Sequence, residues 1–113
     1  MVNSIDNQAV GGYTLFENDF VWDLGKEAVN VQKHGINFRI ASKALLDPYR
    51  VIIFDEKHSL EERRFFCLGN VKGCVLTVRF VYRENKIRIL GAGYWRKGVR
   101  IYEEENRRRY ADW

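Results

Sequence analysis

The chain has 113 residues, of which 46% are hydrophobic and 30% charged, and this composition predicts one folded domain rather than a disordered chain. No apolar run approaches the ~20 residues that cross a membrane, and no basic region followed by an apolar run indicates a secretory signal. The two cysteines are too few for a disulfide scaffold, so we expect a protein of the reducing cytoplasm.

The positive charge is concentrated towards the C-terminus. Residues 79–113 hold ten Lys and Arg against five Asp and Glu, whereas residues 1–78 hold nine against ten. This asymmetry favours an anionic partner, with nucleic acid as the first candidate, and charge that serves solubility alone is the alternative.

The first part of the chain predicts an extension, a strand and two helices. Residues 1–16 are polar without a sustained period and are expected to form a flexible N-terminal extension, which leaves 17–113 as a single domain. A short strand is predicted at 20–22. Asp23 then caps a helix that Gly35 ends. A second helix follows, capped by Asn37 and stopped by Asp47-Pro48.

The rest of the chain predicts a strand meander and a last helix. The expected elements are strands at 51–54, 64–69, 74–83 and 86–92 and a helix from 97 onwards. Short turns at 70–73 and 84–85 make the adjacent strands antiparallel. The predicted order is therefore β-α-α-β-β-β-β-α, an α+β domain with helices packed on one face of an antiparallel sheet.

Cations are predicted to gather on one face of this sheet. In the strand at 74–83 the even positions are apolar, whereas Arg79 and Arg83 stand at odd positions. The four-residue loop at 70–73 would pair Arg64 with Arg79, and the turn at 84–85 would pair Arg83 with Lys86. The resulting basic face consists of Arg64, Arg79, Arg83, Lys86 and Arg88.

Two interpretations of the basic face remain open. Like charges across neighbouring strands repel, which favours an anionic ligand on this face. Alternatively, loop acids partner the cations, and the candidates are Asp55, Glu61 and Glu62. The C-terminal Arg107-Arg108-Arg109 is a weaker nucleic-acid candidate, because Glu103-Glu104-Glu105 lies four residues earlier and favours a self-neutralised helix face. The other stripe of that helix is expected either to pack against the domain or to bind a partner. It comprises Val99, Tyr102, Asn106, Tyr110 and Trp113.

No cofactor or metal site is predicted. The chain has neither metal-ligand spacings nor a phosphate-binding glycine loop. Cys67 and Cys74 fall on predicted strands and are interpreted as small core residues. His34 and His58 are the acid–base candidates, against the ordinary roles of a helix-end histidine and a solvated loop histidine.

Several short motifs together resemble the BrnT toxins. They are Phe20-Val21-Trp22-Asp23, Lys26, Asn30, Lys33-His34-Gly35-Ile36-Asn37-Phe38, Ala41, Asp47-Pro48, Asp55, His58, Glu62, Arg64, Gly69, Arg83, Ile87-Arg88-Ile89 and Tyr102-Glu103. The resemblance covers about residues 20–103. The motifs W-D-x-x-K, K-H-G, D-P and H…E-x-R are specific as a set.

The resemblance implies the toxin half of a bacterial type II toxin–antitoxin pair. It implies a RelE-like fold, metal-independent endoribonuclease activity that arrests translation, and no cofactor. It also implies a BrnA-type antitoxin with a ribbon-helix-helix dimer, so that operator DNA is contacted only through the antitoxin, and no membrane is involved. The chain departs from the family at Gly91-Ala92-Gly93, where Ser-Ala-Arg is typical.

The expected function is therefore RNA cleavage by a BrnT-like toxin. The predicted catalytic residues are Arg64, Arg83, Arg88, Lys33, His34 and His58, and the predicted RNA-binding residues are Arg79, Lys86, Arg96 and Lys97. Because of the departure at Gly91-Ala92-Gly93, the alternative is a catalytically degenerate module that binds RNA or a partner. A DNA-binding regulator is the third possibility, and no helix-turn-helix signal supports it.

Overall fold

The computed structural model describes residues 19–111. The predicted extension at 1–16 and the predicted stripe residue Trp113 lie outside these residues. The elements are β1 (Phe20–Trp22), α2 (Leu24–His34), α3 (Phe38–Ala44), β2 (Val51–Asp55), a 3-10 helix (Glu56–His58), β3 (Arg64–Val71), β4 (Cys74–Arg83), β5 (Lys86–Gly93) and α4 (Arg96–Arg109). The predicted order of helices and strands is confirmed, with the 3-10 helix added in the charged loop.

The predicted helix caps are confirmed at α2 and α3. Asp23 Oδ1 accepts the backbone N–H of Lys26 at 2.9 Å, which satisfies one orphan donor of the first turn of α2. Gly35 ends α2 in the left-handed conformation, at φ 72°. Asn37 Oδ1 accepts the N–H of Ile40 at the start of α3 in the same way.

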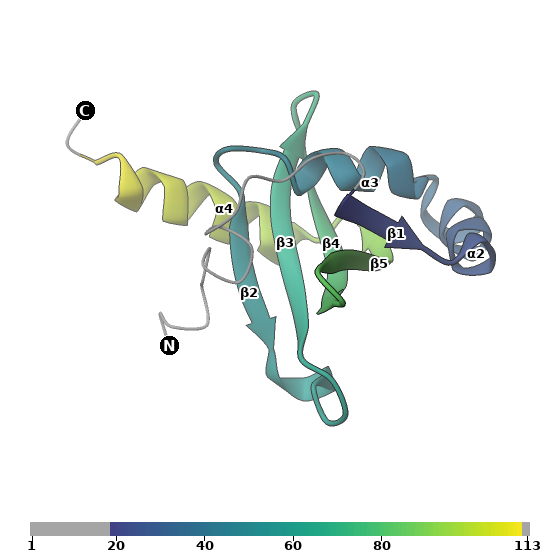
Figure 1. Ribbon diagram of the computed structural model, residues 1–113. Coiled ribbons are helices and arrows are strands. Elements are labelled where there is room, and N and C mark those ends of the chain that lie inside the picture. The colour runs from purple at the N-terminus through teal and green to yellow at the C-terminus, as the bar shows by residue number, and fades with distance from the viewer. Residues whose placement is uncertain (1–18, 112–113) are drawn as a thin grey trace.

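The sheet is mixed, which corrects the predicted antiparallel sheet. Its strand order is β1-β5-β4-β3-β2, and β1 pairs with β5 in parallel. Short turns determine the direction only of strands that follow each other in the chain. The direction of β1 is decided by α2 and α3, which carry the chain from β1 at one edge of the sheet to β2 at the other (Figure 1).

The hairpin registers agree with the prediction at one turn and differ at the other. Arg83 pairs with Lys86 across the predicted turn at 84–85. The preceding turn is tighter than the predicted loop at 70–73, because Val71 pairs with Cys74 and both Lys72 and Gly73 have positive φ. Arg64 therefore lies opposite Val81 rather than Arg79. A shift of two residues keeps every side chain on its predicted face.

Helices cover both faces of the sheet, which corrects the prediction that they pack on one face. On the first face α3 packs closely against β3, since a Cβ added at Gly69 would overlap the backbone of Ala44. On the second face α4 packs at Gly98, whose added Cβ would lie 2.6 Å from Thr77 Oγ1. Figure 1 shows α4 passing behind β2 and β3. The second face also buries apolar side chains, Leu68 among them, and these require cover.

Candidate active site

The structure places the basic residues of β3, β4 and β5 on the face that α4 covers in part. Arg79 pairs with Phe66 on one side and Gly91 on the other, and Arg88 pairs with Val81. Arg64 also pairs with Val81, from the opposite neighbour. The face expected from strand alternation therefore exists, and its cations come from three adjacent strands.

A loop acid partners one end of this basic face. Arg83 donates from Nε and Nη2 to the two carboxylate oxygens of Glu62, each at 2.8 Å. This hydrogen bonding lowers the pKa of Glu62, and Arg64 and Arg88 lower it further by their charges. The Glu62 carboxylate is thus a local counterion for three of the predicted catalytic arginines.

Asp55 and His58 form a second pair near this end of the sheet. His58 Nδ1 lies 2.9 Å from Asp55 Oδ2, and Asp55 is opposite Arg64 in the β2–β3 register. Asp55 is buried, whereas the side chain of His58 is 64% exposed. His58 is therefore a surface histidine whose ring is oriented by Asp55.

His34 and Arg79 meet in a groove formed by two neighbouring cavities. One cavity, of about 360 Å³, and the other, of about 420 Å³, are both lined by His34 and Arg79. Lys26 and Lys33 of α2 line the second cavity. The groove therefore contains both an imidazole, a group suited to proton transfer, and cations that attract phosphate.

Asn30 joins the helix that carries His34 to β5. It lies one helical turn before His34 and is buried, and its side-chain amide makes two hydrogen bonds with Ala92, to the carbonyl at 3.0 Å and from the N–H at 3.0 Å. A third bond runs from Asn30 Nδ2 to the carbonyl of Ile36 at 2.9 Å. β1 pairs with β5 only as far as Ile89. Beyond that point the Asn30 amide takes the place of a neighbouring strand and hydrogen-bonds the backbone N–H and carbonyl of Ala92. The C-terminus of α2 is thereby fixed beside Gly93.

The absence of a side chain at Gly91 leaves room for the Arg79 guanidinium. A Cβ added there would overlap the Arg79 guanidinium, which lies close over the Gly91 backbone. Gly93 in turn faces His34, with an added Cβ 3.8 Å from Nδ1. Gly91 and Gly93 therefore border both polar groups of the groove.

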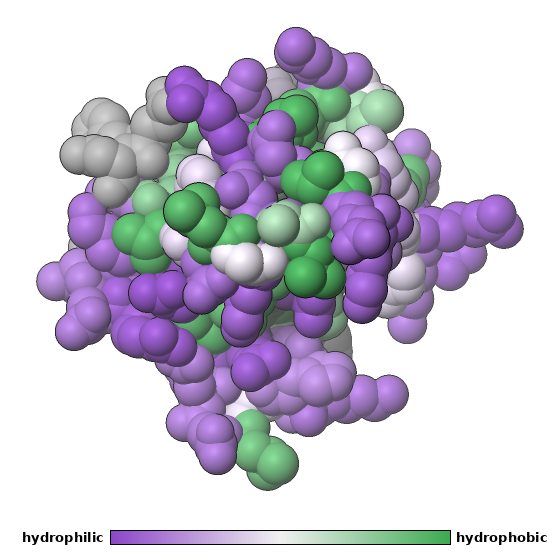
Figure 2. All heavy atoms as spheres, turned by 90° about the vertical axis from the view of Figure 1, so that its right-hand side faces the viewer, coloured by the Kyte–Doolittle hydropathy of each residue, from purple (hydrophilic) through white to green (hydrophobic). Residues whose placement is uncertain are grey.

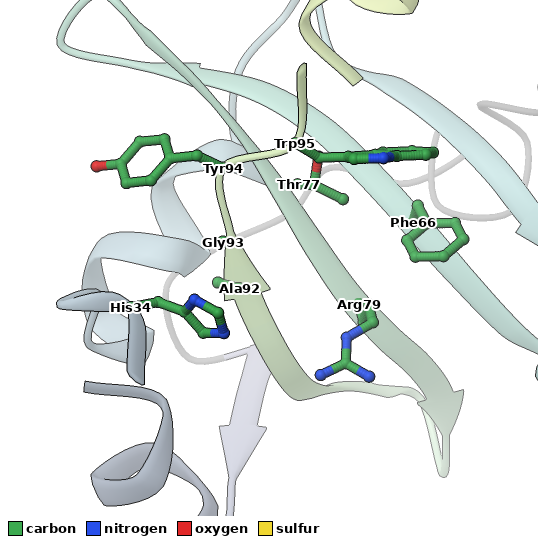
Figure 3. Close-up of a pocket in the computed structure, with 8 residues that line it drawn as sticks. All are labelled: His34, Phe66, Thr77, Arg79, Ala92, Gly93, Tyr94 and Trp95. Atoms are coloured by element: carbon green, nitrogen blue, oxygen red, sulfur yellow. The ribbon is translucent and has the colours of Figure 1, made fainter. Parts of the chain in front are cut away.

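Aromatic rings form the other wall of the first cavity. Figure 3 shows His34 and Arg79 on one side, and Trp95 and Phe66 on the other. The Phe66 and Trp95 ring centroids are 5.7 Å apart. Tyr94 also lines the cavity and is 66% exposed.

The predicted site residues thus fall into two groups. Lys33, His34 and Arg79 line the groove. The Glu62 cluster, which we define as Glu62 with the arginines that lower its pKa, contains Arg64, Arg83 and Arg88. Lys86 is paired in register with Arg83, and Arg96 and Lys97 begin α4 next to Trp95.

Several residues of the groove were not predicted as site residues from the sequence, Asn30 and Phe66 among them. Asn30, Phe66 and Trp95 contribute through contacts with segments distant in the chain. Asn30 carried one available signal, because it lies four residues before His34 and so shares its helix face. Phe66 carried a signal as well, because strand alternation places it on the same face of the sheet as Arg64.

The structure shows the environments of the two cysteines and of the predicted stripe on α4. Cys67 is fully buried, and burial raises the pKa of its thiol, whereas Cys74 is exposed at the start of β4 and is not the predicted core residue. On α4, the Tyr102 hydroxyl donates to Asp47 Oδ2 at 2.6 Å, and the Tyr110 ring packs against Tyr49 at 5.6 Å. The described part of the predicted stripe therefore packs within the molecule.

Exposed apolar side chains lie on α2, beside the groove. Leu24, Val29 and Val31 are 75%, 49% and 43% exposed, and Val29 also lines the second cavity. Figure 2, which faces this end of the molecule, shows hydrophobic atoms interspersed with hydrophilic ones. The groove thus has an apolar border as well as basic walls.

Residues 19–111 contain no group of three or more His, Cys, Asp or Glu side chains placed to hold a metal ion. Within the same residues, no helix is long and apolar enough to cross a membrane.

The comparisons with known proteins give one family. The model described as "Ribonuclease toxin, BrnT, of type II toxin-antitoxin system" matches residues 22–98. This range includes α2, α3, the whole five-stranded sheet apart from the first residues of β1, and the start of α4. No curated protein matches the chain.

Proposed function

Because the chain belongs to the BrnT family of type II toxin–antitoxin ribonuclease toxins, we propose that it is a metal-independent endoribonuclease whose reaction takes place in the groove. Cleavage of cytoplasmic RNA would then arrest translation. The observation that carries the proposal is the position of His34 and Arg79, which face one groove from separate elements. The order of helices and strands also supports a RelE-like fold.

The proposed reaction is attack of a ribose 2′-hydroxyl on the adjacent phosphate. A base takes the 2′-hydroxyl proton, the new bond forms between the 2′-oxygen and phosphorus, and the bond from phosphorus to the 5′-oxygen breaks. An acid gives a proton to the departing 5′-oxygen, which leaves a 2′,3′-cyclic phosphate and a 5′-hydroxyl. His34 is proposed as one proton-transfer group, and Lys33 as the other group or as a positioning cation.

Arg79 is proposed to stabilise the charge that develops on the phosphate oxygens. Its planar guanidinium can donate to two oxygens at once, and it occupies the space that a side chain at Gly91 would fill. The arginines of the Glu62 cluster are proposed to bind phosphates on either side of the cleaved bond, together with Lys86, Arg96 and Lys97. His58 is the weakest member of the proposed site, since it lies with Asp55 away from the groove lining.

The test is RNA cleavage by the purified chain in the presence of a chelator. We expect wild-type cleavage to survive EDTA, and Arg79→Ala and His34→Ala to lose it while remaining folded. Arg107→Ala, an exposed change on α4, is the matched control and should cleave as wild type. A folded wild-type chain that binds RNA and leaves it intact would contradict the proposal and favour the catalytically degenerate binding module.

We further propose that the partner is a BrnA-type antitoxin that covers the groove, and that operator DNA is contacted only through it. The basic walls and the apolar border formed by α2 suit a segment that is both acidic and apolar. Co-expression followed by size-exclusion chromatography should give one complex that dissociates more readily when Leu24 and Val29 are changed to Ser. Separate elution of the two wild-type proteins at micromolar concentration would contradict this partner.

A further inference from the structure

The first cavity has both aromatic and basic walls. A simple anion would use only the basic wall, and an apolar molecule only the aromatic one. The cavity volume of about 360 Å³ is at the lower end of the ~300–1,000 Å³ found for small-molecule pockets. One wall is aromatic, from Phe66 and Trp95, and the other carries the Arg79 guanidinium and the His34 ring (Figure 3). A ligand that fits both walls has a flat apolar ring and an attached anion.

Trp95 is accessible and held in place. It is 37% exposed, its ring is supported by Phe66, and Lys97 Nζ lies 5.9 Å from its centroid. Trp95 Cε3 also lies 3.1 Å from the Cβ position of Gly98. A large ring fixed by neighbours on two elements loses little conformational freedom when a second ring stacks on it.

The space beside Trp95 is continuous with the groove. Gly93 has no side chain, so the region between Trp95 and His34 stays open. Arg79 and His34 line both cavities, and an RNA strand whose phosphate lies against Arg79 can therefore place a neighbouring base in the first cavity. Base stacking on aromatic side chains beside basic groups is the usual mode of single-stranded RNA binding.

We propose that this pocket is a nucleobase subsite, in which one base of the RNA next to the cleaved phosphate stacks on Trp95. The proposal rests on the proposed ribonuclease function and adds the ligand and the residue that would select the cleavage position. Stacking accepts every base because each has a flat face, so the subsite requires an unpaired nucleotide more than a particular base.

The test uses 2′-O-methyl RNA, which binds but lacks the hydroxyl needed for cleavage. A short oligonucleotide is made with a single abasic position moved along the strand, and its affinity for the wild-type chain is measured. We expect one position at which loss of the base weakens binding by about 5- to 150-fold, the range for one stacked base. Equal affinity at every abasic position would overturn the subsite, and this measurement needs no variant.

Variants then assign the subsite to Trp95. Trp95→Ala should weaken binding by the same factor and abolish the difference between intact and abasic strands, while Trp95→Phe should retain most of both. Tyr82→Ala removes a ring of similar exposure from the opposite face of the sheet and should bind as wild type. A folded Trp95→Ala chain with wild-type affinity would overturn the assignment.

The outcomes separate this inference from the proposed function. A wild-type chain that cleaves RNA but shows no abasic effect refutes the subsite and leaves the ribonuclease function standing. A chain that shows the abasic effect but leaves unmodified RNA intact supports the subsite and refutes cleavage. The salt dependence of binding gives a further check, since Trp95→Ala should leave its slope unchanged whereas Arg79→Ala should reduce it.

Discussion

The change of Asn30 to Ala tests whether one buried amide joins α2 to the sheet and so positions His34. The substitution removes the hydrogen bonds to the N–H and carbonyl of Ala92 and to the carbonyl of Ile36. Each buried backbone group left without a partner costs ~1–3 kcal/mol. Allowing for water entering beside α2, we expect the free energy of unfolding to fall by about 3 kcal/mol.

That loss corresponds to a fall of about 12 °C or more in the unfolding midpoint of a domain of this size. Thermal and urea unfolding, followed by circular dichroism, measure it directly. Gln32→Ala is the matched control, because it removes an exposed amide from the same helix and should change stability by less than ~0.5 kcal/mol. We also expect Asn30→Ala to reduce RNA cleavage at a temperature where the variant is folded, since His34 is no longer fixed. Unfolding of Asn30→Ala at the wild-type midpoint would refute this account.

The remaining predictions concern the cations of the site. Arg79→Lys should lower the cleavage rate by about two to three decades, because an ammonium cannot donate to two phosphate oxygens, and single-turnover assays with Arg107→Ala as control measure the loss. Glu62→Gln removes the counterion of Arg83 and should tighten RNA binding and steepen its salt dependence, as filter binding at several salt concentrations would show; weaker binding would contradict the pairing. Because the pKa of Glu62 is lowered in the folded chain, the stability that its ion pair contributes is present above the unfolded pKa and is lost as the pH falls through the folded pKa. This contribution is small, since the pair with Arg83 is exposed. Comparing the unfolding of the wild type and Glu62→Gln across pH measures it. Gly91→Ser should lower cleavage by displacing the Arg79 guanidinium, and an unchanged or higher rate in the same single-turnover assay would contradict this reasoning.

Local features of the chain were predictable because neighbouring residues determine them. The ends of the first two helices depend only on nearby residues. Asp23 and Asn37 cap their first turns by hydrogen bonds, and Gly35 ends α2 in the left-handed conformation. The basic face was predictable for a similar reason. Strand alternation has a period of two residues, so even the incorrect register at Lys72-Gly73 left each cation on its predicted side.

The parallel pairing of β1 with β5, the position of α4 and the content of the groove were decided by the tertiary structure alone. Phe20 meets Ile87, and Asn30 meets Ala92, across more than half of the chain, and no local pattern encodes such pairs. The sequence by itself determined that cations and a histidine are present and on which side of their elements they lie. Only packing decided that His34 and Arg79 share a groove with Trp95 while Arg83 is held by Glu62, because burial of apolar surface and pairing of buried polar groups act between distant segments.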